Sequence, residues 1–249
     1  MTGILFNALV AVMVSLVGVA LLRTGEGGSG RVWGYFLAFL VAYVAVPALL
    51  AASGWLDRYD PLPAPALLLV LGLTIVTIGF VASLPGRRLA LAIPAAALVG
   101  FHAFRVPVEL LLHRLALEGV IPEVMTYTGR NFDIVAGITG GILGLWLIRR
   151  EIPPLILHLW NVGCLALLAN IVTIAVLSTP VPFRVFTEGP TNVVPSTFPY
   201  VWLPTVLVQL ALAGHLLLYR RLRAAARDQP RAPAPGTPNA TRPTSSTPF

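Results

Sequence analysis

Apolar runs of about 20 residues recur along this chain, and no other feature limits its fold as strongly. A helix of that length crosses a hydrocarbon core of roughly 30 Å. The chain is 57% hydrophobic and 11% charged, whereas soluble domains average roughly 45–50% apolar and 25% charged residues. We therefore predict an all-α, polytopic integral membrane protein that is embedded in the lipid bilayer.

Seven of the apolar runs have the length of a membrane span, at approximately 3–22, 33–54, 64–84, 89–112, 132–148, 154–177 and 200–219. The third and fourth runs are divided only by the short turn at 85–88, where Pro-Gly precedes two arginines. The seven runs define a transmembrane domain of residues 1–222. The segment 223–249 is rich in Pro, Ala, Ser and Thr, so we predict a disordered cytoplasmic tail there.

The basic residues indicate how the spans are oriented. All seventeen are arginines, which excludes a lysine Schiff base such as a retinal attachment site. Most short-loop arginines follow the first, third, fifth and seventh spans, and the positive-inside rule places those segments in the cytoplasm. The N-terminus is then predicted outside and the C-terminus inside. This distribution also explains the net charge of +7 without nucleic acid, because no basic face is interleaved with aromatic residues.

Four ionisable residues interrupt the apolar fourth span within "FHAFRVPVELLLHRL", residues 101–115. At about 100° per residue they fall within an arc of roughly 80° on one helix face. Ionisable groups are costly when they face lipid, so we predict that this face points into the bundle or a wet cavity. The four residues are His102, Arg105, Glu109 and His113.

Two interpretations of this stripe are open. Arg105 and Glu109 are i,i+4 neighbours, and an ion pair between them would serve only helix packing. In the other interpretation, Arg105 holds an anion or acts as a counter-charge, while Glu109 and His102 accept protons. The second interpretation makes the stripe a ligand or proton site in the outer half of the bundle.

Three further polar residues are assigned to the same site. Asn131 and Asp133, in "TYTGRNFDI", bring the chain back into the membrane on the side of Glu109, where both are also suited to cap the fifth helix. Asn170 lies in the sixth span at a depth close to that of His102. The predicted site therefore combines residues of the fourth, fifth and sixth spans.

A divalent metal is the alternative ligand. Glu109 and His113 lie one turn apart on the same face, and Asp133 would complete a set of one histidine and two carboxylates. His102 and His113 cannot share an ion, because eleven residues of helix separate them by roughly 16 Å.

Two predictions concern helix packing. Asn161 and His215 lie at similar depths in the sixth and seventh spans, which favours a hydrogen bond between those helices. The segment "AGITGGILG" contains glycines at four-residue spacing, namely Gly137 with Gly141 and Gly140 with Gly144. Small residues at this spacing are typical of close helix contacts.

Five segments between residues 100 and 222 resemble a group of hypothetical seven-span bacterial inner-membrane proteins: "FHAFRVPVELLLHRL", "MTYTGRNFDI", "LWNVG", "FPYVWLP" and "GHLLLYRRL". The resemblance implies a multi-pass protein of a bacterial cytoplasmic membrane, and it implies no activity or cofactor.

Three function classes follow from these patterns. We favour a protein that binds or transports a small solute or proton through the polar site. The first alternative is a membrane-embedded metal-dependent enzyme, in which the ion activates water. The second is a structural or accessory membrane subunit, in which the polar residues serve stability or assembly.

Overall fold

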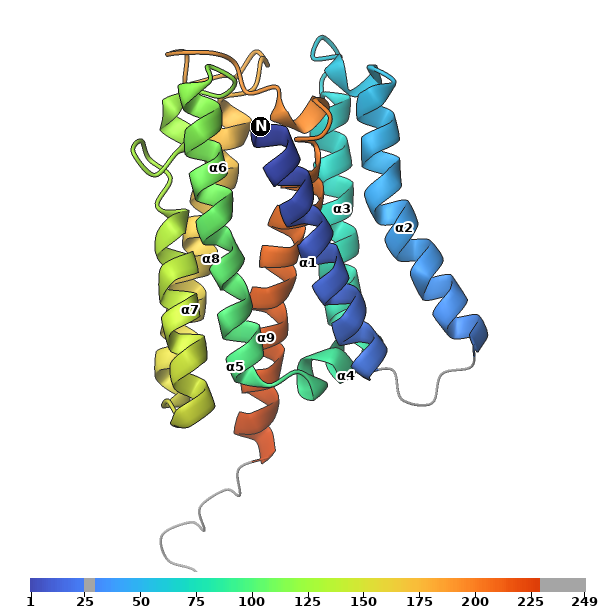
Figure 1. Ribbon diagram of the computed structural model, residues 1–249, viewed down its shortest axis with the longest axis vertical. Helices are drawn as coiled ribbons and strands as arrows, with labels where there is room; N and C mark the ends of the chain where they lie inside the picture. The colour runs from blue at the N-terminus through green and yellow to red at the C-terminus, as the bar shows by residue number, and fades with distance from the viewer. Residues whose placement is uncertain (25–29, 229–249) are drawn as a thin grey trace, which may run out of the picture.

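The computed structural model describes residues 1–24 and 30–228, and within these ranges every regular element is a helix. Figure 1 shows the α-helices α1 (Thr2–Thr24), α2 (Gly30–Ala52), α3 (Pro65–Ala82), α4 (Leu84–Ala92), α5 (Ala95–Gly100), α6 (Arg105–Leu117), α7 (Asp133–Arg149), α8 (Pro154–Leu177) and α9 (Val208–Asp228). Short helical turns are η1 (Trp55–Asp57), η2 (Phe101–Phe104), η3 (Glu123–Met125), η4 (Val194–Ser196) and η5 (Leu203–Leu207). The prediction of an all-α architecture is confirmed.

Five helical segments in the described part of the chain are long and apolar enough to cross a membrane: Thr2–Leu21, Pro65–Ala82, Ala95–Leu117, Pro154–Leu177 and Leu203–Arg227. Two further helices are apolar but shorter. α7 has 17 residues, and the apolar part of α2 covers Leu37–Ala52. The length and composition of these helices are those of a polytopic membrane protein.

The helices form a bundle in which successive long segments run in alternating directions (Figure 1). α9 lies in the middle and packs against α3, α4, α5 and α8. α1, α2 and α3 lie on one side of α9, and α5 to α8 on the other. The chain starts at one end of the bundle, and α9 finishes at the opposite end.

The fourth apolar run is divided differently from the prediction. Residues 89–92 belong to α4, which ends before Pro94, so the predicted span of 89–112 begins too early. Ile93 is extended, with φ −82° and ψ 126°, because a residue that precedes proline avoids the helical conformation. α5, η2 and α6 then form one rod, Ala95–Leu117. Pro107 interrupts no helix, because it lies in the first turn of α6, where proline is tolerated.

The arginines of α9 hold the ends of α3 and α4. Arg220 donates to the carbonyl oxygens of Val81 and Ser83, the latter at 2.9 Å, and Arg221 donates to that of Leu91 at 2.7 Å. Helix C-termini leave carbonyls without helical partners, so these contacts stabilise both ends. α9 therefore continues past the predicted boundary at residue 222, and residues 229–249 of the predicted tail lie outside the described part of the chain.

Glycines bring α7 into contact with the α5–α6 rod. A Cβ atom on Gly144 would lie 2.7 Å from the backbone nitrogen of Gly100, and one on Gly140 would lie 3.0 Å from Cβ of His102. A Cβ on Gly141, in contrast, would meet Ala103 at an ordinary 3.5 Å. The predicted close packing at the glycine repeat is confirmed, and it fixes the height of α7 beside α6.

The segment between α6 and α7 folds back into the bundle rather than crossing its end. Ile121, Met125, Thr126 and Asn131 are all buried, and α7 begins well below the end that α6 reaches (Figure 1). This return brings Asn131 and the start of α7 beside α6.

Candidate functional site

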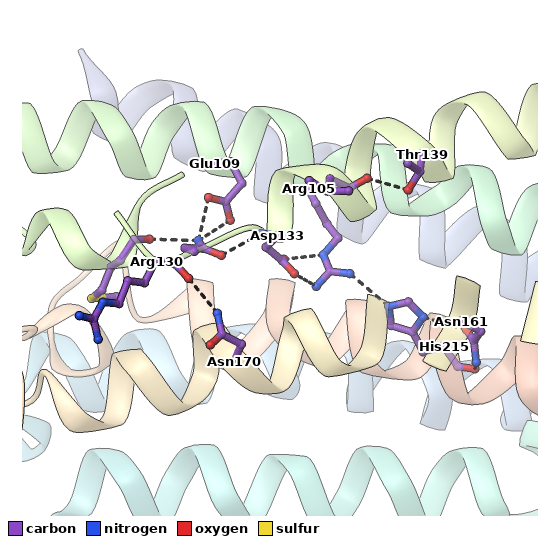
Figure 2. A network of polar contacts seen from close by, with 11 residues as sticks. Arg105, Glu109, Arg130, Asp133, Thr139, Asn161, Asn170 and His215 are labelled. Atoms are coloured by element: carbon purple, nitrogen blue, oxygen red, sulfur yellow. Dashed lines mark hydrogen bonds and ion pairs between the residues drawn. The ribbon is translucent and has the colours of Figure 1, made fainter. Parts of the chain in front are cut away.

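A buried ion pair connects α6 with α7. Arg105 and the Asp133 side chain are 2% and 8% exposed. The Arg105 Nε atom donates to Oδ2 of Asp133 at 2.6 Å, and Nη2 donates to Oδ1 (Figure 2). Of the two open interpretations of the stripe, the one that pairs Arg105 with its i,i+4 neighbour Glu109 is therefore not supported. The planar guanidinium fork matches both oxygens of a carboxylate that faces it from a neighbouring helix.

A histidine on α9 completes the contacts of Arg105. Nη1 of Arg105 lies 3.1 Å from Nε2 of His215, and Nδ1 of His215 lies 2.8 Å from Oδ1 of Asn161. Since a guanidinium only donates, Nε2 accepts and Nδ1 carries the proton that is donated to Asn161. Asn161 returns a bond from Nδ2 to the backbone oxygen of His215 at 3.2 Å. The predicted hydrogen bond between Asn161 and His215 is confirmed.

His102 is fully buried but takes no part in these hydrogen bonds. Its ring stacks on that of His215, with centroids 3.9 Å apart and planes 25° apart, and it meets the Trp160 ring edge-to-face at 5.6 Å. Neither ring nitrogen has a hydrogen-bond partner among the described residues. His102 therefore faces α9, about two turns along the rod from Glu109.

Glu109 is bound by one neutral side chain. It is 1% exposed, and its two carboxyl oxygens lie 2.8 and 2.7 Å from Nδ2 of Asn131. The same nitrogen lies 3.0 Å from the backbone oxygen of Met125, so its two hydrogens face three acceptors. No cationic side chain of the described residues forms an ion pair with Glu109. Its carboxyl group thus has spare hydrogen-bonding capacity.

Asn131 links the two carboxylates structurally. Its Oδ1 atom accepts from the backbone nitrogen of Asp133 at 3.0 Å, which stabilises the first turn of α7. The N-cap of α7 is Phe132, which has no side-chain cap bond, so the prediction that Asn131 or Asp133 caps this helix is wrong; Asn131 instead forms an Asx turn just before it. Figure 2 shows the polar residues as a row along the bundle axis, from Glu109 through Asp133 and Arg105 to His215.

A cavity of about 90 Å³ lies against the carboxylates. Arg105, Glu109 and Asp133 line it from α6 and α7, while α3, α8, α9 and the segment before η4 supply mostly apolar side chains. An engineered apolar cavity of about 150 Å³ holds benzene, and one water needs roughly 10–15 Å³. The cavity therefore has room for several waters or for a solute of a few non-hydrogen atoms.

Two predicted site residues lie away from this row. Asn170 donates from Nδ2 to the backbone oxygen of Arg130 at 2.9 Å, so it holds the returning segment and does not reach the central cluster (Figure 2). His113 is partly exposed and packs on the ring of Tyr127, with centroids 4.8 Å apart.

The predicted metal set is not assembled. Within residues 1–24 and 30–228, no three His, Cys, Asp or Glu side chains lie close enough together to hold an ion. Asp133 is held by Arg105, and His113 lies on Tyr127, so neither side chain converges with Glu109. The hypothesis of a site made by Glu109, His113 and Asp133 is therefore not supported.

Sequence reasoning missed that His215 belongs to this cluster. Its pairing with Asn161 is predictable from depth, but its contact with Arg105 joins residues 110 positions apart. One sequence feature could have identified His215: like His102, it is an ionisable residue within an apolar span.

No protein-family model, curated protein or solved structure matches this chain. The resemblance to bacterial inner-membrane proteins therefore stays a prediction, and the case for function depends on the geometry of the site.

Proposed function

We propose that this chain is a seven-span protein of a bacterial cytoplasmic membrane, with its N-terminus outside and its C-terminus in the cytoplasm. α2 and α7 would be the two spans in addition to the five of full length. The alternating helix directions support this topology (Figure 1). The arginines at positions 87, 88, 149, 150, 220, 221 and 223 lie in α4, at the end of α7 or in the last turns of α9, and so gather at the end of the bundle where α9 finishes.

We further propose that the protein binds or transports a small solute or a proton at Glu109, in the outer half of the bundle. The supporting observation is that this carboxyl group is buried against a cavity and has no cationic partner within the described part of the chain. A carboxylate in that position gains from a proton or from a ligand that donates hydrogen bonds. Arg105 and Asp133 already neutralise one another, so Glu109 is the group left for a ligand.

The size of the cavity limits which solutes can bind there. A cavity of about 90 Å³ is too small for most metabolites. Its mostly apolar wall favours a small molecule with one N–H or O–H group and few other atoms. Water, a proton or a small amine such as methylamine meets both conditions.

Proton conduction and methylamine binding test this proposal directly. The full chain is reconstituted into vesicles that contain a pH-sensitive dye, and proton entry is followed under an imposed potential. Binding of radiolabelled methylamine is measured in the same vesicles. We expect at least one of the two signals to exceed that of protein-free vesicles, and Glu109→Gln to lower it to background.

Glu123→Gln is the matched control, because Glu123 is an exposed carboxyl group in the neighbouring returning segment. It should leave both signals unchanged. Two outcomes overturn the proposal: signals in the wild type that equal the background, or signals that Glu109→Gln leaves intact. The first outcome, with stability altered by Glu109→Gln, would favour an accessory or structural role.

A further inference from the structure

A second and larger cavity, of about 360 Å³, lies between α1, α2, α3, the start of the α5–α6 rod and α9. No described residue lines both cavities, so this one is separate from the Glu109 site. Its volume falls within the range of roughly 300–1,000 Å³ that is typical of ligand pockets.

Among the described residues, none that lines this cavity is charged. Its side-chain polar groups are those of Tyr43, Thr77 and Gln209, and the first two lie 3.3 Å apart, hydroxyl to hydroxyl. A charged headgroup would lose its hydration here without gaining a counter-charge. The cavity therefore suits an uncharged, mostly apolar molecule.

Gln209 carries an unused hydrogen-bond acceptor. The side chain is 2% exposed, and its Nε2 atom donates to Oγ1 of Thr74 at 3.0 Å and to the backbone oxygen of Pro204 at 3.1 Å. Oε1 has no partner among the described residues. The amide cannot be turned around, because the carbonyl of Pro204 can only accept.

The backbone around Gln209 is also unusual. Pro204 lies in η5, a single turn of π-helix that leads into α9. Such single turns of π-helix are frequent at functional sites. Here the Pro204 carbonyl oxygen accepts from the nitrogen of the Gln209 amide, which leaves the amide oxygen without a partner among the described residues.

The cavity is reached from the side of the bundle. Leu16 on α1 and Phe39 on α2 both line it, and they are 52% and 47% exposed. A molecule dissolved in the bilayer can therefore enter between α1 and α2.

We propose that this cavity binds a neutral lipid with a hydroxyl group, whose O–H donates to Oε1 of Gln209 and whose apolar chain extends between α1 and α2. A hydroxyl both donates and accepts, so it also complements the hydroxyls of Tyr43 and Thr77. This inference does not depend on the role of Glu109.

Photolabelling with a diazirine-bearing dodecanol tests the proposal. The full chain is reconstituted in phosphatidylcholine vesicles, and labelled peptides are mapped by mass spectrometry. We expect labelling on α1, α2 and α9 at cavity residues. Excess dodecanol should compete with it, whereas dodecane and laurate should compete weakly.

Two substitutions locate the binding determinants. Gln209→Leu keeps roughly the same side-chain size but removes the acceptor together with the amide donor to Thr74 and Pro204, and should weaken labelling about fivefold, the value of one ordinary hydrogen bond. Ala213→Trp adds bulk to the cavity wall and should abolish labelling there. Leu145→Trp, at a position on α7 that is 67% exposed, is the control and should change nothing.

Each remaining outcome overturns the proposal. Labelling that spreads over the outer surface and survives Ala213→Trp would indicate ordinary lipid contact. Competition by dodecane as strong as that by dodecanol, or unchanged labelling in Gln209→Leu, would show that no hydroxyl is recognised. If Ala213→Trp fails to fold, the competition series and Gln209→Leu still decide the question.

Discussion

Removing the charge of Arg105 should destabilise the protein more than any substitution of an exposed charge. Arg105→Met keeps an unbranched apolar stem but leaves Asp133 buried without its cation. Arg105 is 2% exposed and the Asp133 side chain 8%, so the pair is shielded from bulk solvent. Breaking a buried pair from one side costs about 3–5 kcal/mol, and we expect a loss in that range.

Removing both charges should cost less than removing one. In Arg105→Met combined with Asp133→Leu, no unpaired charge remains, and such replacements are often neutral or stabilising. Nε2 of His215 still loses its donor, which costs about 1–3 kcal/mol for a buried acceptor. The double variant should therefore be more stable than Arg105→Met alone, and the coupling energy should be about 2 kcal/mol or more.

Unfolding in mixed micelles, followed by tryptophan fluorescence, measures these free energies. Arg114→Gln is the control, because Arg114 and Glu118 form an exposed pair at 3.4 Å with side chains 57% and 42% exposed. It should cost less than about 1 kcal/mol. The reasoning is refuted if Arg105→Met behaves like this control, or if the two single losses simply add in the double variant.

Two further predictions concern packing and the inner end of the polar row. Gly144→Ala should cost about 1–3 kcal/mol in the same unfolding assay, because its Cβ would lie 2.7 Å from the Gly100 nitrogen. Gly141→Ala, with 3.5 Å of clearance, should be neutral or slightly stabilising, and equal effects would contradict the contact. His215→Phe should lower the free energy of unfolding by about 1–3 kcal/mol, because Oδ1 of Asn161 loses its donor. Adding Asn161→Leu should recover part of that loss. A double variant with no recovery would argue against the hydrogen bond.

The membrane character and the buried face of the α5–α6 rod are both predictable from local sequence. Apolar runs of span length form helices wherever they lie in the chain, because backbone groups in lipid must be satisfied within the segment. Likewise, the burial of His102, Arg105 and Glu109 follows from the cost of exposing ionisable groups to lipid. The break in the helix before Pro94 is also predictable from the sequence, because proline restricts the backbone conformation of the residue before it.

Only the tertiary structure decided which residue binds each buried charged side chain. Arg105 binds Asp133, 28 positions away, and forms no ion pair with its i,i+4 neighbour Glu109. Glu109 instead accepts a hydrogen bond from Asn131. That choice depends on the height and rotation of α7, which the glycine contacts and the returning segment fix together. The ionisable residues on one face of the α5–α6 rod show that buried hydrogen-bonding partners are needed. Those partners lie on other helices, and the packing of the whole bundle decides where these helices lie. The sequence by itself determined that polar groups are buried; packing determined that Glu109 has no counter-charge among the described residues.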